Sequence, residues 1–126
     1  MSDCRKAVHA ASVLVVDDDD DVRAVAVATF EDLGLRVYEA STASEALRLL
    51  EKQPDIRVLF SDVRMPGMDG TELAAEAQKR WPELHIVLTS AYSGAATIRN
   101  VAFVPKPYRL RDIQRAVTAD LMMEPR

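Results

Sequence analysis

Acidic, hydroxyl and amine side chains directly follow four apolar stretches of this sequence. The stretches are residues 13–16, 58–60, 86–88 and 103–104. The side chains behind them are, in the same order, the aspartate run 17–21, Asp62 after Ser61, the hydroxyls of Thr89 and Ser90, and Lys106 between two prolines. In an open parallel sheet the carboxyl ends of the strands share one edge, where such folds build their sites. We therefore expect these side chains to meet.

Asp17, Asp18 and Asp62 together point to metal-assisted phosphoryl chemistry. Like charges held close disfavour one another unless a cation intervenes, and Mg²⁺ (or Mn²⁺) prefers carboxylate and carbonyl oxygens. A carboxylate beside such a metal can attack phosphorus and form an acyl phosphate. Transfer of a phosphoryl group depends mostly on positioning and charge neutralisation, for which Lys106 supplies a positive charge and Ser90 a hydroxyl donor.

Strands and helices are predicted to alternate along the chain. The predicted strands are 13–16, 35–40, 56–60, 84–88 and 102–104, and the predicted helices are 22–33, 41–52, 71–81 and 109–122, with a loop over 62–70. Nearly continuous apolar strands are typical of a parallel sheet covered on both faces. We therefore predict a flavodoxin-like, doubly wound α/β fold with five parallel strands in the order 2-1-3-4-5 and helices on both faces.

One of these helices and one segment lead to more specific expectations. In the helix 22–33 the residues expected on the buried face are Val22, Val25, Ala26, Thr29, Phe30 and Leu33. The segment between Ser90 and Lys106 is short and weakly patterned, so the fourth helix is expected to be short or missing.

Composition bounds the class of protein. With 126 residues, 48% hydrophobic and 29% charged, the chain fits one globular domain, assigned to residues 12–122 between a leader (1–11) and a tail (123–126). A net charge of −4 argues against a nucleic-acid surface. The longest apolar runs are shorter than the ~18 residues of a membrane helix, no signal peptide is apparent and Cys4 is the lone cysteine, so a cytoplasmic location is expected.

Four motifs give the chain a family resemblance. They are residues 13–19, 62–70, 88–92 and 103–108. In this order they resemble the receiver domain of bacterial two-component response regulators over residues 12–121, and most of all the receivers of hybrid histidine kinases. The resemblance implies a phosphorelay function in signal transduction.

The same resemblance implies roles for the acidic residues. The aspartate at the place of Asp62 accepts the phosphoryl group in this family. Asp17 and Asp18 match the pair that holds Mg²⁺ together with Asp62 and the backbone carbonyl of Arg64.

The last two motifs supply the remaining implied roles. Ser90 matches the switch hydroxyl, Lys106 the phosphate-binding lysine, and Phe103 the aromatic residue that changes rotamer on activation. The Lys106–Pro107 bond is expected to be cis, which suits a bond to proline. Arg64 and Tyr92 would flank the phosphate, and we interpret them as modulators of dephosphorylation because both are large enough to obstruct an attacking water.

The implied partners are a histidine kinase or histidine phosphotransfer protein and a downstream protein target, with no direct contact to nucleic acid or membrane. The oligomeric state stays open. The chain would catalyse only its own phosphorylation and dephosphorylation, so it is not expected to be an enzyme with an external substrate. Phosphorylation is expected to alter the surface around strands four and five.

Alternatives exist for the chain and for its aspartates. The chain could be a receiver-like interaction module that is never phosphorylated, or a metal-dependent phosphatase. The aspartate run could be a solvated acidic turn, but an EF-hand fails because Val22 stands where glycine is needed and Ala28 where glutamate is needed. Residues 19–21 are interpreted as capping and first-turn residues of the following helix, and Asp69 with Gly70 as a turn.

Overall fold

A parallel five-stranded sheet forms the centre of the protein. The computed structural model describes residues 12–65, 67–90 and 101–105, with side chains for 12–65 and 67–89. The strands are β1 (Ser12–Val16), β2 (Arg36–Ala40), β3 (Ile56–Asp62), β4 (His85–Ser90) and β5 (Val101–Pro105). Their order is β2-β1-β3-β4-β5, and every neighbouring pair is parallel. The predicted flavodoxin-like order is therefore confirmed.

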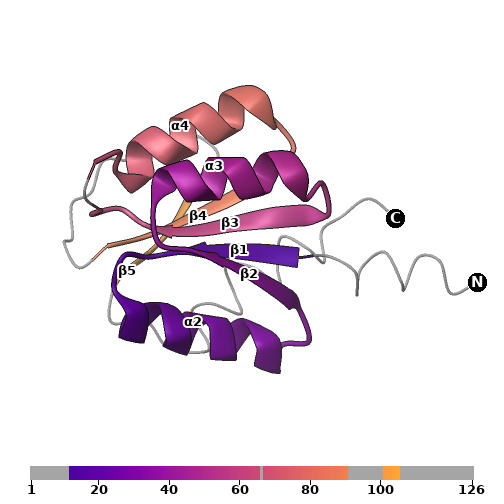
Figure 1. Cartoon of the computed structure of the whole chain (residues 1–126), viewed down its shortest axis with the longest axis vertical. Helices are drawn as coiled ribbons and strands as arrows, with labels where there is room; N and C mark the ends of the chain where they lie inside the picture. Colours follow the sequence, from indigo (N-terminus) through magenta and orange to yellow (C-terminus); the bar gives the residue numbers. More distant parts are fainter. Residues whose placement is uncertain (1–11, 66, 91–100, 106–126) are drawn as a thin grey trace, which may run out of the picture.

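Helices lie on both faces of this sheet. The described helices are α2 (Asp20–Asp32), α3 (Ala43–Lys52) and α4 (Gly70–Arg80). Figure 1 shows α3 and α4 side by side above the sheet and α2 below it. The predicted short fourth helix, the predicted helix 109–122, the leader and the tail lie outside the described residues. Within the described part of the chain, no helix combines the length and the apolar character needed to cross a membrane.

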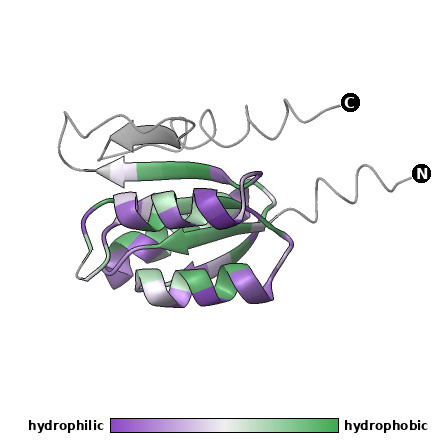
Figure 2. Cartoon of the chain, turned by 90° about the horizontal axis from the view of Figure 1, so that it is seen from above, coloured by the Kyte–Doolittle hydropathy of each residue, from purple (hydrophilic) through white to green (hydrophobic). Residues whose placement is uncertain are grey.

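The core is divided by the sheet into two clusters. On the side of α3 and α4 the strands contribute Leu14, Val16, Ala40, Ile56, Leu59, Ile86 and Leu88. On the side of α2 they contribute Val13, Val15, Val58, Phe60 and Val87, which meet Ala26 and Phe30 of the helix. Burial of both faces explains why these strands are apolar throughout, and Figure 2 shows the central strands mainly in the hydrophobic colour.

The ends of the helices follow local hydrogen bonding. Asp19 caps α2 by accepting from the N–H groups of Asp21 and Val22, so the helix begins at Asp20, two residues before the predicted start. At its other end Gly34, with φ +87°, donates to Glu31 O, an arrangement that favours glycine. Thr42 caps α3, which therefore begins at Ala43 and not at residue 41.

The prediction that Val25 lies on the buried face of α2 is wrong. Val25 is 60% exposed, whereas Ala26 and Phe30 are buried. Val27 packs against the α2-side cluster in its place. Helical spacing allowed either flank of the stripe to face the sheet, and the packing against β1 and β2 selected the side of Val27.

The end of β3 and the start of α4 touch through a glycine. The N–H of Gly70 donates to Val63 O at 2.7 Å. A Cβ atom on Gly70 would lie 2.2 Å from the backbone oxygen of Asp62, well inside van der Waals contact. The absence of a side chain at residue 70 therefore lets α4 begin directly against Asp62.

A polar cluster ties together the opposite, amino-terminal edge of the sheet. The Ser12 hydroxyl donates to Asp55 Oδ2 at 2.6 Å, and the Tyr38 hydroxyl donates to the same carboxylate at 3.3 Å. Arg36 Nη1 lies 3.8 Å from Asp55 Oδ2. The hydrogen bond from Ser12 lowers the pKa of Asp55 most, and Tyr38 and Arg36 lower it further. Together they outweigh the effect of burial, so the pKa of Asp55 lies below its ordinary value.

Replacing Gly70 with alanine is expected to displace the end of β3. The collision with the Asp62 carbonyl should lower the free energy of unfolding by about 1–3 kcal/mol, as overpacking does, and should weaken the Mg²⁺ binding that the sequence predicts. Denaturant unfolding and metal titration would measure the two effects. Gly34→Ala is the matched control, because it strains a positive φ but meets nothing within 4 Å. Equal loss of Mg²⁺ affinity in both variants would contradict this account.

Replacing Asp55 with asparagine is expected to cost stability only where the carboxylate is charged. Because the folded pKa is lowered, the stabilisation is present above the unfolded pKa and disappears as the pH falls through the folded pKa. At neutral pH the variant should lose about 1 kcal/mol, a low value for a charged hydrogen bond that suits partial exposure. Unfolding curves from pH 7 down to about 3 would test this, since the difference should shrink below the ordinary aspartate pKa of about 3.9. A pH-independent difference would contradict it.

Candidate functional site

Three carboxylates converge at the carboxyl-terminal edge of the sheet. Asp17 and Asp18 directly follow β1, and Asp62 is the last residue of the neighbouring strand β3. One carboxylate oxygen from each of them lies within 4.8 Å of the other two. Asp17 and Asp62 are only 5% and 9% exposed, whereas Asp18 is exposed. We call Asp17, Asp18 and Asp62 the acidic cluster.

Local hydrogen bonds orient Asp17. Its N–H donates to Ala40 O in β2 at 3.2 Å, and its Oδ1 accepts from the N–H of Asp19 at 2.9 Å. Asp19 in turn caps α2, so Asp17 is linked both to the edge strand and to the first turn of the helix. The five-aspartate run is thus divided between the acidic cluster and the start of α2, and the capping interpretation of residues 19–21 is confirmed.

Arg23 binds the backbone of the same turn. Its Nη1 donates to Asp17 O at 2.7 Å, and its Nε donates to Glu39 Oε1 at 3.1 Å. Its Nη2 donates to Asp20 Oδ1 at 2.7 Å. No sequence motif marks Arg23, because its partner Glu39 lies 16 residues further along the chain, in the strand β2.

Asp62 is held between a strand and a loop. The adjacent N–H of Val63 donates to Thr89 O at 2.9 Å, so the sheet still pairs at this point. The N–H of Arg64 approaches Asp62 Oδ1 at 3.4 Å. Asp62 was predicted to begin a loop, but β3 extends through it, which fixes its backbone more firmly than a loop would.

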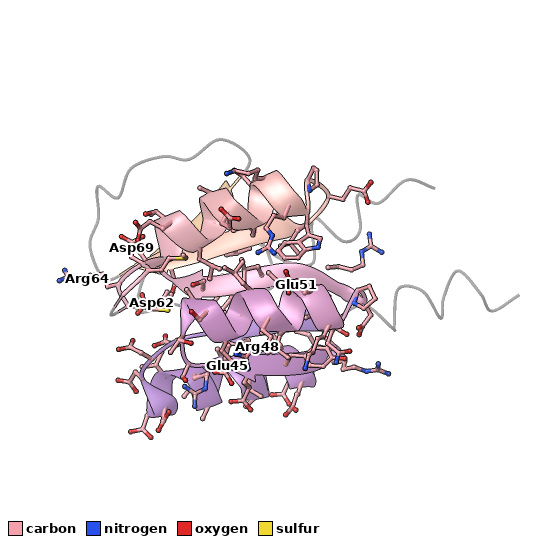
Figure 3. All side chains as sticks on the ribbon, turned by 45° about the horizontal axis from the view of Figure 1, so that its top comes forward. Glu45, Arg48, Glu51, Asp62, Arg64 and Asp69 are labelled. Atoms are coloured by element: carbon pink, nitrogen blue, oxygen red, sulfur yellow. The ribbon has the colours of Figure 1, made fainter. Side chains whose placement is uncertain are left out.

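The Arg64 side chain lies apart from the acidic cluster. It is exposed, and Figure 3 shows it extending outward and away from Asp62. Arg64 and Asp69 also line a pocket of about 480 Å³ in the β3–α4 loop, whose described lining does not include the acidic cluster. The predicted metal contact of the Arg64 carbonyl and the predicted modulating role of its side chain stay predictions.

Two hydroxyl residues stand near the end of β4. Thr89 is the register partner of Asp62 and is 1% exposed. Ser90 is one residue further on and pairs with Pro105 of β5. Alternation along the strand puts Thr89 on the α2 side with Val87. Ser90 is the predicted phosphate ligand, and its side chain lies outside the described part.

The side chains of the remaining predicted site residues lie outside the described part of the structure. Phe103 lies in β5, where only the backbone is described. Tyr92, Lys106 and Pro107 lie outside the described residues. Their roles, including the cis Lys106–Pro107 bond, stay predictions.

Asp69 is a helix cap. It accepts from the N–H of Glu72 at 2.9 Å and from the Thr71 hydroxyl at 2.6 Å, and Glu72 accepts in return from the Asp69 N–H. The bond from Thr71 and the bond from Glu72 hold the pKa of Asp69 below its ordinary value. This capping box starts α4 at Gly70, so the predicted turn at Asp69 and Gly70 is wrong: Asp69 is the helix cap and Gly70 the first residue of the helix.

The donor set of the acidic cluster fits a divalent cation. Three carboxylates this close repel one another by an amount on the order of a few kcal/mol per pair at an effective dielectric constant of about 20. All three offer hard oxygen donors, as Mg²⁺ and Mn²⁺ prefer. The cluster could therefore hold Mg²⁺ through Asp17, Asp18 and Asp62.

Comparison with known proteins places the chain in a family. The family model described as response regulator receiver domain matches residues 13–118. The chain is 36% identical over 121 residues to the sensor kinase CckA of Brucella abortus (strain 2308), covering 90% of this chain and 13% of that protein. It is 31% identical over 107 residues to the response regulator receiver protein CpdR of the same strain, covering 80% and 88%.

A solved structure agrees with these matches. The receiver domain from the hybrid histidine kinase CckA superimposes with a TM-score of 0.77 at 33% identity, covering 87% of this chain and 98% of that one. Several relatives are much longer: the chain spans 13% of CckA and 23% of the DNA-binding transcriptional regulator NtrC of Escherichia coli (strain K12). The parallel sheet, the acidic cluster at its carboxyl-terminal edge and these matches agree, and the chain belongs to the response regulator receiver domain family.

Proposed function

We propose that this receiver accepts a phosphoryl group on Asp62 in a Mg²⁺-dependent reaction. The observation that carries the proposal is the convergence of Asp17, Asp18 and Asp62, with one oxygen of each within 4.8 Å of the others. Membership of the receiver family supports phosphate as the group that such a cluster serves.

The transfer is a substitution at phosphorus. A carboxylate oxygen of Asp62 attacks the phosphorus of a phosphohistidine, and an O–P bond forms. The P–N bond breaks, and its electron pair leaves with the imidazole nitrogen, which takes up a proton. Asp62 is suited to attack because β3 pairs with β1 up to Ser61 and with β4 through Asp62 itself, which fixes the backbone of Asp62.

Asp17 and Asp18 would hold Mg²⁺ together with Asp62 and the carbonyl of Arg64. The bound ion would neutralise the negative charge that gathers on the carboxylates and on the phosphoryl oxygens. Asp17 is already oriented for this by the N–H of Asp19, so little rearrangement is needed when the ion arrives.

The phosphorylated state would be read through β4 and β5. Lys106 and Ser90 would bind the phosphoryl oxygens, and Phe103 would fill the space that Ser90 vacates. Because β4 and β5 are paired strands, a shift at the end of one strand is passed to the surface of the other. Arg64 and Tyr92 would slow hydrolysis by restricting the access of water.

The partners follow from this cycle. The donor is a histidine kinase or a histidine phosphotransfer protein, and the output is a protein target bound through the altered surface. The chain acts as a cytoplasmic signalling switch and catalyses only its own phosphorylation and dephosphorylation. Residues 12–122 would suffice for this function.

Removal of the Asp62 carboxylate is the primary test. After incubation with Mg²⁺ and acetyl phosphate, the unsubstituted chain should gain the mass of one phosphoryl group in an alkali-labile linkage, and Asp62→Ala should gain none. Asp69→Asn is the matched control, because it removes a nearby carboxylate while asparagine remains a good N-cap. No mass gain in the unsubstituted chain would contradict the proposal and favour an interaction module that is never phosphorylated.

The two hydroxyls of β4 can be told apart by substitution. Ser90→Ala should slow phosphorylation about tenfold, the effect of losing one hydrogen bond to a charged group worth roughly 1.5 kcal/mol. Thr89→Val keeps the buried volume and should leave the phosphorylation rate unchanged. Rates would be followed by mass spectrometry on variants whose unfolding has been measured. The reverse pattern would transfer the phosphate-binding role to Thr89, the register partner of Asp62.

A further inference from the structure

We propose that Arg23 is a positioning residue that sets the metal affinity of the acidic cluster by holding the turn at Asp17 in place. The inference rests on the metal site of the proposed function, and it concerns a side chain that would not itself contact the ion. It also gives roles to Asp20 and Glu39, which lie outside the acidic cluster.

Arg23 connects three segments of the chain at one point. It is the fourth residue of α2 and donates to the carbonyl of Asp17, directly after β1. Its other two bonds reach Asp20 at the start of α2 and Glu39 in the edge strand β2. The guanidinium group therefore fixes the carboxyl end of β1 relative to both the following helix and the neighbouring strand.

The geometry calls for arginine in particular. The Arg23 side chain is only 16% exposed, although its partners Asp20 and Glu39 are 85% and 51% exposed. Three acceptors lie in three directions around one planar group, and each takes a different nitrogen. A lysine would keep the charge but could not present this fixed fork of donors.

Arg23 binds the backbone carbonyl of Asp17, and the carboxylate of Asp17 has other partners. The carboxylate of Asp17 accepts from the N–H of Asp19, and its carbonyl accepts from Arg23. The Asp17 carbonyl belongs to the peptide bond that leads to Asp18. If the turn loosens, both metal carboxylates lose their positions together, and the ion must then order them as it binds.

The sign of the effect separates positioning from simple electrostatics. A positive charge near a cation site repels the ion, so a purely electrostatic Arg23 would weaken binding and its removal would strengthen it. A positioning Arg23 acts in the opposite direction, because its removal frees the ligands. Substitution by lysine sharpens the distinction, since it keeps the charge and loses the geometry.

Mg²⁺ titration by calorimetry, supported by Mn²⁺ titration with electron paramagnetic resonance, tests the proposal. Arg23→Met should raise the Mg²⁺ dissociation constant about tenfold, the usual cost of losing a group that orients metal ligands, and Arg23→Lys should come close to it. Amide hydrogen exchange at Asp18 and Asp19 in metal-free protein should be faster in both Arg23 variants.

Arg36→Met is the matched control, and it should leave the Mg²⁺ affinity unchanged. Like Arg23→Met, it removes one positive charge. Arg36, however, lies in the edge strand β2, is 62% exposed and pairs with Asp55 at the opposite edge of the sheet. Unchanged or tighter Mg²⁺ binding in Arg23→Met and Arg23→Lys would overturn the positioning role while leaving the proposed function intact. Absence of Mg²⁺ binding by the unsubstituted chain would overturn both. If Arg23→Met does not fold, Arg23→Lys decides the question by the same measurements.

Discussion

The mutual repulsion of Asp17, Asp18 and Asp62 is the constraint on which the rest of the structure depends. One oxygen of each lies within 4.8 Å of the others, and Asp17 and Asp62 are only 5% and 9% exposed. Folding must therefore hold like charges together before a cation arrives. It does so by attaching each carboxylate to an element that is stabilised by other interactions, so that the whole domain opposes their separation.

The two supporting elements are built differently. Asp62 is carried by β3, which pairs with strands on both sides and is buried on both faces. Asp17 and Asp18 lie past the end of β1, where strand pairing no longer fixes the chain. There the support comes from side chains and from the helix start: the cap at Asp19, and Arg23 with its bond to the Asp17 carbonyl.

The two edges of the sheet divide stability from function. At the amino-terminal edge, Ser12, Tyr38 and Arg36 surround Asp55, and this carboxylate has its charge satisfied within the protein. At the carboxyl-terminal edge, three carboxylates gather so closely that they are suited to a cation and a phosphoryl group. The same residue type thus serves opposite purposes, because at one edge its neighbours are donors and at the other they are further acids.

The sequence by itself determined the strand order, the two-sided burial of the sheet and the meeting of the acidic side chains. The two-sided burial follows from the apolar runs, which are local signals. The strand order and the meeting of the acidic side chains follow once those runs are assigned to a doubly wound parallel sheet, in which the strand ends share one edge. Only the tertiary structure decided which flank of α2 faces the sheet, that Arg23 reaches Glu39, and that α4 begins against the carbonyl of Asp62. Each of these depends on the relative placement of segments that are distant along the chain, and a pattern of spacing within one segment carries no information about that placement.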